Sequence, residues 1–385
     1  MPRPELLARL AELYAGRPVV LGPGPVAGWT SWIQRLDRLG CRTLVLDLPA
    51  PATVLITDAL RTHDRLLRDL PPTAAAAVEA HDPERRGVFR TTPFVTSDEP
   101  VLGRPVTGGR PAAFLALEDK AVADRVWSGA GVPAAPSRVV PLDPQALAEA
   151  TEELRSPLGA VWTGDGFTGG GDYVRWVDDH DDEMRARAFF APRCQRVRVM
   201  PFLDGVPCSV HGFVLADGTA ALRPVEIAVL RDRSARTFVH GGLSSTWDPP
   251  AADREHLREV ARRVGEHLRA AHGYRGAFGV DGVLTDGGFL PTELNPRLSA
   301  GATLLTRVDA DFFQLLQANL LAGVDTGVGV ADVEELVPAM DAARRAELVG
   351  ARPVDLPRGS RLAAYLSARE PHLEAAPERR RERRQ

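Results

Sequence analysis

Lysine is nearly absent from this chain of 385 residues, because only one of its 47 lysine and arginine residues, Lys120, is a lysine. Arginine presents a broad planar fork, whereas lysine presents a compact point charge on a flexible stem. In an arginine-rich sequence, a position that keeps the compact charge is typical of a phosphate pocket. Chance survival of one lysine is the alternative. Lys120 is therefore a candidate phosphate contact, to be weighed against the other motifs.

Cysteine and long apolar runs are also scarce. Three cysteines are scattered without a C-x-x-C pair, which excludes that kind of zinc site and suits a reducing cytoplasm. No apolar run approaches the ~18 residues of a membrane span, and the charged residues 1–7 predict no secretory signal. The net charge of −4 and pI near 6.2 disfavour nucleic-acid or membrane-surface binding. We therefore expect a cytoplasmic protein that binds neither nucleic acid nor membranes.

The composition, 44% hydrophobic and 25% charged, is that of a globular protein with two or three packed units. Residues 1–112 predict a small Rossmann-like α/β domain, with a strand at 18–21, a helix at 29–39 and a strand at 41–48. Glycines in the turn 22–28 have nearly the spacing of a dinucleotide-binding loop. Its two prolines remove N–H groups that phosphate binding needs, so a nucleotide site there is only an alternative.

A glycine-rich segment, 164–171, lies between strand-like residues 158–163 and 173–177. It predicts a hairpin whose loop has few side chains to keep a ligand away. A flexible surface hairpin is the alternative, but glycine combined with threonine and aspartate favours a flap over phosphates.

From residue 196 the pattern indicates antiparallel sheet. A strand at 197–203 is expected to turn at Asp204-Gly205 and pair with 208–215, and 220–230 follows a second turn. A long helix is predicted at 252–271, with Gly273 after its end. Beyond residue 330 we expect a carboxy-terminal segment at 331–369 and a disordered charged tail at 370–385.

The most distinctive element is a predicted hairpin of strands 275–284 and 289–297. With a three-residue loop at 286–288, Thr285 pairs with Phe289 and Asp281 lies directly opposite Glu293. Opposed like charges destabilise a sheet unless a cation lies between them.

Asn295 lies on the same face as Glu293, two residues further along the strand. Two carboxylates and an amide oxygen are hard ligands that suit Mg²⁺ or Mn²⁺ rather than zinc. An exposed polar face on an edge hairpin is the alternative, but it does not explain the apolar, proline-bounded run around Glu293 and Asn295.

Glu293-Leu-Asn-Pro-Arg297, with Asp281 twelve residues upstream, closely resembles the metal-binding E-x-N-P-R signature of the ATP-grasp superfamily. Asp119-Lys120, the glycine-rich hairpin and residues 200–205 match the family in order and separation. The resemblance covers about half the chain. It implies an α+β grasp domain with antiparallel sheets, made of a small lobe at 113–195 and a large lobe at 196–330.

The resemblance also implies a role for each matching residue. Arg297 would stabilise charge on the transferring phosphoryl group, and Asp281, Glu293 and Asn295 would hold Mg²⁺ (or Mn²⁺). The implied ATP contacts are Lys120 at the phosphates, Gly169, Gly170 and Gly171 in the flap, Met200, Phe202 and Leu203 at adenine, and Asp204 as the candidate at ribose.

One departure from the family concerns a second phosphate lysine, usually found on the strand entering the glycine-rich hairpin. Here that strand reads Val161-Trp-Thr-Gly-Asp165, without lysine. Either an arginine supplies the charge, with Arg198, Arg223 and Arg231 as candidates, or the nucleotide is held differently. We therefore take Arg223 and Arg231 as candidate catalytic residues; an ordinary charged strand edge is an equal alternative. His240, Trp247 and residues 301–303 are candidates for an acceptor pocket, or for structural roles.

The activity implied by the resemblance is that of an ATP- and Mg²⁺-dependent ligase. It would activate a small-molecule carboxylate as an acyl phosphate and join it to an amine, releasing ADP and phosphate. The alternatives are a small-molecule kinase, a nucleotide-binding sensor without turnover, and an NAD-binding protein using the amino-terminal glycines. A homodimer is a candidate assembly. Fold similarity does not name the two substrates.

Overall fold

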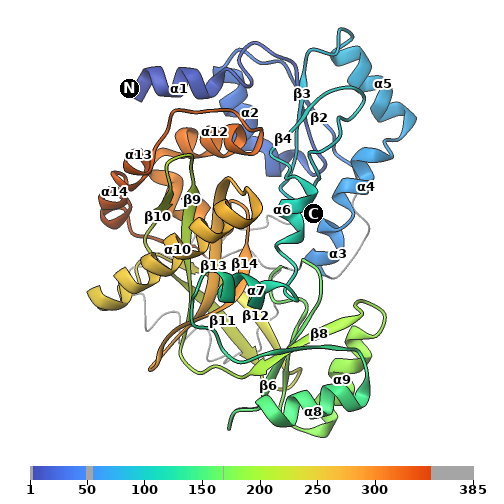
Figure 1. Cartoon of the computed structure of the whole chain (residues 1–385). Helices are drawn as coiled ribbons and strands as arrows, with labels where there is room; N and C mark the ends of the chain where they lie inside the picture. The colour runs from blue at the N-terminus through green and yellow to red at the C-terminus, as the bar shows by residue number, and fades with distance from the viewer. Residues whose placement is uncertain (1–2, 49–54, 168, 348–385) are drawn as a thin grey trace, which may run out of the picture.

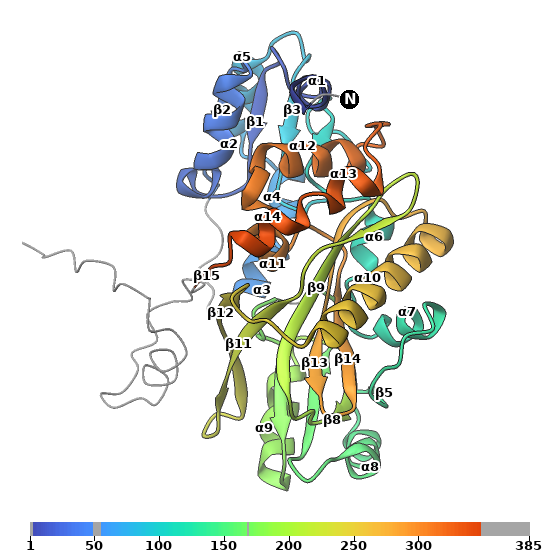
Figure 2. The same cartoon turned by 90° about the vertical axis from the view of Figure 1, so that its left-hand side faces the viewer.

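The computed structural model of the chain describes residues 3–48, 55–167 and 169–347. In Figure 1 the chain begins in an amino-terminal unit at the top, runs into a small lobe at the bottom and returns to a large lobe in the middle. Figure 2 shows the amino-terminal unit and the two lobes from the side. The predicted tail at 370–385 lies outside the described residues. No helix in the described part is long and apolar enough to cross a membrane.

The amino-terminal unit is built on a parallel sheet in the order β2-β1-β3-β4. The strand–helix–strand order expected at its start is present, and helices cover the sheet as parallel sheets require. Its strands are β1 Val19–Leu21, β2 Thr43–Val45, β3 Val88–Arg90 and β4 Val106–Thr107. Its helices are α1 Arg3–Ala11, α2 Val26–Arg38, α3 Ile56–Leu60, α4 His63–Arg68 and α5 Pro72–His81.

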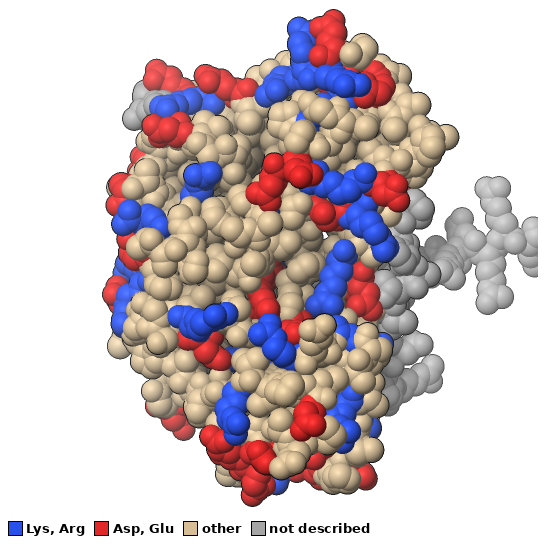
Figure 3. Space-filling view, turned by 45° about the vertical axis from the view of Figure 1, so that its right-hand side comes forward, with Lys and Arg blue, Asp and Glu red and all other residues tan. Residues whose placement is uncertain are grey.

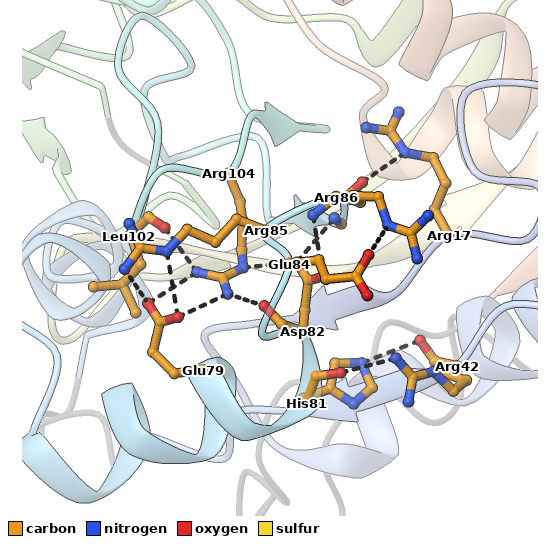
Figure 4. A network of polar contacts seen from close by, with 11 residues as sticks. Arg17, Arg42, Glu79, His81, Asp82, Glu84, Arg85, Arg86, Leu102 and Arg104 are labelled. Carbon is orange, nitrogen blue, oxygen red and sulfur yellow. Dashed lines mark hydrogen bonds and ion pairs between the residues drawn. The ribbon is translucent and has the colours of Figure 1, made fainter.

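A buried arginine holds the end of α5 against the following loop (Figure 4). The Arg104 side chain has no exposed surface, and its Nε donates to Asp82 Oδ2 at 2.8 Å while Nη2 lies 3.2 Å from Glu79 Oε2. Asp82 also accepts the backbone N–H groups of Arg86 and Gly87. A buried guanidinium needs such partners, so this network is a structural ion pair.

The small lobe contains four antiparallel strands in the order β7-β6-β8-β5, with α8 and α9 beside them in Figure 1. They continue the sheet of the large lobe through the pairing of Arg175 with Thr237. Trp162 and Phe190 are fully buried in the core of the small lobe. Its elements are β5 Arg138–Pro141, α8 Pro144–Leu154, β6 Ala160–Gly164, β7 Val174–Val177, α9 His180–Phe190 and β8 Arg196–Pro201. The connection from the amino-terminal unit contains α6 Ala112–Ala116 and α7 Ala123–Gly129.

The large lobe is a sheet in the order β14-β13-β9-β11-β12, with β10 beside β9 and β15 beside β12. Helix α10 crosses one face, and α12 packs toward the amino-terminal unit, where Arg3 pairs with Asp309. The strands are β9 Val206–Val214, β10 Thr219–Ala221, β11 Val225–Asp232, β12 Thr237–Ser244, β13 Gly276–Thr285, β14 Gly288–Asn295 and β15 Ala346–Glu347. The helices are α10 Ala251–His272, α11 Ala300–Leu305, a 3₁₀ turn Thr306–Asp309, α12 Ala310–Leu321, α13 Val330–Glu334 and α14 Val337–Ala342.

The predicted pairing of residues 197–203 with 208–215 is wrong. Strand β8 lies between β5 and β6 in the small lobe, so both of its hydrogen-bonding edges are occupied. Strand β9 instead pairs with β10, β11 and β13. The alternation of each strand is local, but the choice of partner depends on which edges are free. The segment between β8 and β9 therefore connects the two lobes, and we propose a boundary between them near residue 202 in place of residue 195.

Candidate active site

A cavity of about 690 Å³ lies between the glycine-rich hairpin of the small lobe and the sheet of the large lobe. Lys120, Asp281, Glu293, Asn295 and Arg297 all line it. The space-filling view shows a hollow near the middle of one face, where acidic and basic side chains meet (Figure 3). Residues from widely separated parts of the sequence thus line one cavity.

The cavity floor consists of parallel rows of residues across β9, β13 and β14. Ser209, Asp281 and Glu293 form one row, which we call the metal row. His211, Gly279 and Asn295 form the next row. Rows on one face are two residues apart, about 7 Å, so a ligand of nucleotide size spans several of them.

The opposition of Asp281 and Glu293 is confirmed, but the predicted loop is wrong. The turn has two residues, Asp286 and Gly287, so Thr285 pairs with Gly288 rather than with Phe289. A β-bulge after Pro291 adds one residue to β14 and restores the predicted pair. Without that bulge, Asp281 would face Thr292 and Glu293 would point to the other side of the sheet.

The two carboxylates of the metal row are held by polar neighbours. Asn295 Nδ2 donates to Asp281 Oδ2 at 2.9 Å, and Lys120 Nζ lies 2.6 Å from Glu293 Oε2. Burial in the cavity and the charge of Glu293 raise the pKa of Asp281 to about 6. The row is therefore short of positive charge, even with the single lysine beside it.

Asp281, Glu293 and Asn295 fit a magnesium ion whose other ligands are phosphates and water. No group of three or more His, Cys, Asp or Glu side chains with metal-binding geometry occurs among the described residues. Mg²⁺ is commonly bound by one or two carboxylates plus substrate phosphates and water, so the pair Asp281 and Glu293 suffices. Asn295 Oδ1 accepts from Arg297 Nη2 at 2.7 Å and keeps a second lone pair.

Lys120 is positioned by the turn between α6 and α7. Its side chain is buried, and the neighbouring Asp119 accepts N–H groups of Ala121 at 2.9 Å and Gly166 at 2.7 Å through Oδ1. Asp119 thus ties the lysine turn to the glycine-rich loop. The place of Asp119 beside Lys120 in the sequence does not indicate its contact with Gly166.

The glycine-rich loop uses backbone conformations that favour glycine. Gly166, Gly170 and Gly171 have positive φ values of 79°, 63° and 80°. A Cβ atom added at Gly169 or Gly170 would meet no protein atom within 4 Å. Protein packing therefore does not require glycine at position 169. Close approach of a ligand would explain why glycine is present there.

Helix α3 of the amino-terminal unit holds this loop. Asp172 Oδ2 accepts the Thr57 backbone N–H at 3.0 Å, and Thr57 Oγ1 accepts the Gly169 N–H at 3.1 Å. The Tyr173 hydroxyl donates to Asp58 Oδ1 at 2.9 Å. These contacts join residues more than 100 positions apart, and no local sequence pattern indicates them.

The predicted adenine residues Met200, Phe202 and Leu203 line the cavity. The Phe202 ring packs against Trp176 at 5.2 Å between centroids and under the Arg231 guanidinium at 4.6 Å. Asp204 does not line the cavity, and its side chain is 73% exposed beside Arg231. The ribose assignment of Asp204 is therefore the weakest of this group.

The three arginines proposed to replace the second lysine have different surroundings. Arg198 is buried outside the cavity, where Asp124 accepts from its Nε at 3.0 Å and from its Nη2. Arg223 is also buried outside it, donating to the Trp247 carbonyl at 2.9 Å with Asp341 3.0 Å away. We therefore correct the catalytic assignment of Arg223 to a structural one. Arg231 lines the cavity, but beside Phe202 at the expected adenine end.

Two histidines line the cavity near the metal row. Burial, with a smaller effect of Arg297, lowers the pKa of His211 to about 3, and its Nε2 lies 3.1 Å from Ser209 Oγ. Burial also lowers the pKa of His240, against an opposing effect of Glu293. His240 was a candidate for the acceptor pocket, whereas Ser209 and His211 were missed. Alternation along β9 from Pro207 indicates them, once that face is known to be the cavity floor.

Arg297 lies at the end of the metal strand, where Glu118 Oε1 accepts from its Nε at 2.9 Å. Its place in the cavity beside Asn295 suits a cation that contacts a phosphoryl group or a carboxylate. Among the described residues that line the cavity, the basic side chains other than histidine are Lys120, Arg231 and Arg297.

No protein-family model matches the sequence, and no curated protein matches it either. Solved structures match in fold. A carboxyaminoimidazole ribonucleotide synthase from Aspergillus clavatus, complexed with ATP, has a TM-score of 0.54 at 14% identity over 81% of this chain and 78% of that one. The biotin carboxylase domain of the Hydrogenobacter thermophilus 2-oxoglutarate carboxylase, with MgADP and bicarbonate, has a TM-score of 0.56 at 16% identity, over 82% and 72%.

A third similar structure is the phosphoribosylamine–glycine ligase of Thermotoga maritima, with a TM-score of 0.53 at 18% identity over 80% of this chain and 76% of that one. At such identities the similarity concerns the fold and does not carry substrates. Together with the two-lobed arrangement around the cavity, these similarities show that the chain has the ATP-grasp fold.

Proposed function

We propose that this protein is an ATP- and Mg²⁺-dependent ligase that joins a small-molecule carboxylate to an amine. The observation that carries the proposal is the metal row, where opposed carboxylates share one cavity with Lys120 and Arg297. A purely structural hairpin has no reason to place Asp281 opposite Glu293, because the charges repel. The solved structures of similar fold include complexes with ATP and with MgADP, which supports nucleotide binding.

Each side chain has a role that follows from its place. Phe202 and Leu203 would wall the adenine ring, and Lys120 with the N–H groups of the glycine-rich loop would bind phosphates. Asp281, Glu293 and Asn295 would hold Mg²⁺, which neutralises charge on the phosphates when bound. Arg297 would stabilise the charge that spreads over the transferring phosphoryl group.

The proposed reaction has two steps. A carboxylate oxygen attacks the terminal phosphorus of ATP, the bond to ADP breaks, and an acyl phosphate forms. The amine nitrogen then attacks the acyl carbon, loses a proton, and phosphate leaves. The glycine-rich loop, held down by α3, would exclude the water that hydrolyses an acyl phosphate.

A coupled assay for ADP and free phosphate, run with pooled carboxylates and pooled amines, tests this proposal. We expect phosphate release only when both pools and Mg²⁺ are present. A phosphorylated acceptor without free phosphate would indicate a kinase. Tight binding of MgATP without turnover would indicate a sensor, and AMP with pyrophosphate would exclude the acyl-phosphate mechanism.

A further inference from the structure

A buried carboxylate, Glu118, lies between two arginines next to the cavity. Its Oε1 accepts from Arg297 Nε at 2.9 Å, and its Oε2 lies 2.6 Å from Arg110 Nη1. The side chains of Glu118 and Arg110 have no exposed surface. Of the three, Arg297 alone lines the cavity. One carboxylate between two guanidinium groups leaves a net positive charge, which Arg297 presents to the cavity.

The outer arginine anchors this group to the protein frame. Arg110 Nε donates to the Pro93 carbonyl at 2.5 Å, and its Nη1 donates to the Pro296 carbonyl at 3.1 Å. The Phe94 ring lies under both arginines, 5.7 Å from Arg110 Cζ and 5.1 Å from Arg297 Cζ. Buried ions are costly unless they are paired and hydrogen-bonded, so this arrangement places strict geometric demands on its members.

Glu118 stays ionised in this environment. Burial opposes its charged form, but Arg297 and Arg110 together outweigh burial and lower its pKa. The contact between Glu118 and Arg297 is therefore a charge-assisted hydrogen bond, which is stronger and more directional than a neutral one.

The segment that contains Glu118 contacts two points near the carboxyl end of β14. Glu118 holds Arg297, and two residues later Lys120 pairs with Glu293 at 2.6 Å. Arg297 in turn donates from Nη2 to Asn295 Oδ1. Residues 118–120 and 293–297 thus face each other as two short segments joined by ion pairs at both ends.

We propose that Glu118 is a positioning residue that sets the plane of the Arg297 guanidinium through Nε. A guanidinium is a rigid planar fork, so holding Nε leaves the Nη2 edge directed at Asn295 and the cavity. This inference rests on the proposed function, in which Arg297 acts on the phosphoryl group. Glu118 itself does not reach the cavity, so it acts through Arg297.

The test is a mutant cycle with Glu118→Gln and Arg297→Lys. We expect Glu118→Gln to lower kcat by roughly 10- to 100-fold, with the KM for ATP changed less than about threefold, because misdirected catalytic groups cost rates of this order. The double variant should be no slower than Arg297→Lys alone, because both changes remove one function. Additive losses, or a folded Glu118→Gln variant with nearly wild-type kcat, would overturn the proposal.

Asp82→Asn is the matched control. Asp82 and Arg104 also form a buried pair through a carboxylate oxygen and Nε, at 2.8 Å, in the amino-terminal unit (Figure 4). This variant should lower the melting temperature as Glu118→Gln does, and leave kcat within twofold. If Glu118→Gln does not fold, Glu118→Asp keeps the charge but shortens the reach by one methylene. We expect that variant to fold and to lose kcat, and full activity would count against positioning.

A readout independent of turnover separates this inference from the proposed function. In ¹H–¹⁵N spectra of arginine-labelled protein, the Arg297 Nε–H signal is identified by its loss in Arg297→Lys. We expect a slowly exchanging signal that shifts and exchanges rapidly in Glu118→Gln but not in Asp82→Asn. Absence of turnover in the wild type would refute the proposed function, whereas an unchanged Nε–H signal in Glu118→Gln would refute the positioning role.

Discussion

The two hairpins that enclose the cavity are built on different principles. The β13–β14 hairpin is a continuous part of the large sheet, and register fixes the positions of the side chains in its metal row, which would carry the proposed chemistry. The β6–β7 hairpin offers mainly backbone, in a glycine-rich loop that hydrogen-bonds to α3 of the amino-terminal unit. The side chains of one hairpin are thus positioned by sheet pairing, whereas the loop of the other is in contact with a separate unit of the fold.

The largest expected effect comes from removing a charge of the metal row. Glu293→Gln should reduce Mg²⁺-dependent turnover by about a thousandfold or more, because a carboxylate ligand is lost where phosphate charge must be neutralised. Asp286→Asn, in the exposed turn of the same hairpin, is the control and should keep full activity. Steady-state kinetics with melting curves make the comparison. A cooperative loss of fold in Glu293→Gln would show that Glu293 is structural.

The next largest effect on activity should come from a change of side-chain shape at Lys120. Lys120→Arg keeps the charge but introduces a broad fork into a buried position, so kcat/KM should fall roughly 10- to 100-fold. The reverse exchange Arg231→Lys, at a partly exposed position over Phe202, should cost less than about threefold. Full activity of Lys120→Arg would indicate that one lysine survived by chance.

Replacing Asp281 of the metal row should increase stability and reduce activity. The ionised Asp281 carboxylate, buried beside Glu293, disfavours the folded state. Asp281→Asn should therefore raise the free energy of unfolding by about 1–2 kcal/mol at pH 7 without metal. The same substitution should abolish turnover. Protonation of Asp281 contributes its full stabilisation of the folded state below about pH 4, the pKa of an aspartate in the unfolded chain. That contribution is lost as the pH rises through about 6, so the gain should shrink toward zero in acid.

Chemical denaturation at several pH values measures this gain. Asp232→Asn is the control, because the pKa of Asp232 is shifted in the opposite direction. Hydrogen bonds from Ala235 and Ser234 lower the pKa of that exposed carboxylate. Its replacement should give no stabilisation at pH 7. A destabilised Asp281→Asn protein would mean that Asp281 serves the fold through its contacts with Asn295 and Ser209.

The smallest effect belongs to the support of the glycine-rich loop. Tyr173→Phe removes the hydroxyl that donates to Asp58, a hydrogen bond worth about 0.5–1.5 kcal/mol. The KM for ATP should rise about two- to fivefold with kcat retained, and amides of the loop should exchange faster with deuterium. Tyr274→Phe, which removes a buried hydroxyl within the large lobe, should change stability but not these loop amides. Unchanged loop exchange in Tyr173→Phe would contradict support by α3.

Much of the local structure was predictable. The helix ending before Gly273 and the strands that flank the glycine-rich loop follow from periodicity and turn residues. The pairing of β8 with β9 was predicted wrongly, because two alternating strands joined by a short turn resemble a hairpin whether or not their edges are free. The register of the metal row was predicted correctly with the wrong turn, since an unforeseen bulge compensated for it.

By itself, the sequence determined that Glu293 and Asn295 share a strand face, because alternation is a property of the backbone alone. That Asp281 lies opposite Glu293 depends on the bulge in β14, which only the tertiary structure shows. The sequence also determined that one lysine would carry any role needing a compact cation. The tertiary structure decided which arginines reach the cavity, that Glu118 joins Arg110 to Arg297, and that α3 supports the glycine-rich loop. These depend on contacts between distant segments, where competition for strand edges and the need to pair buried charges select the partners.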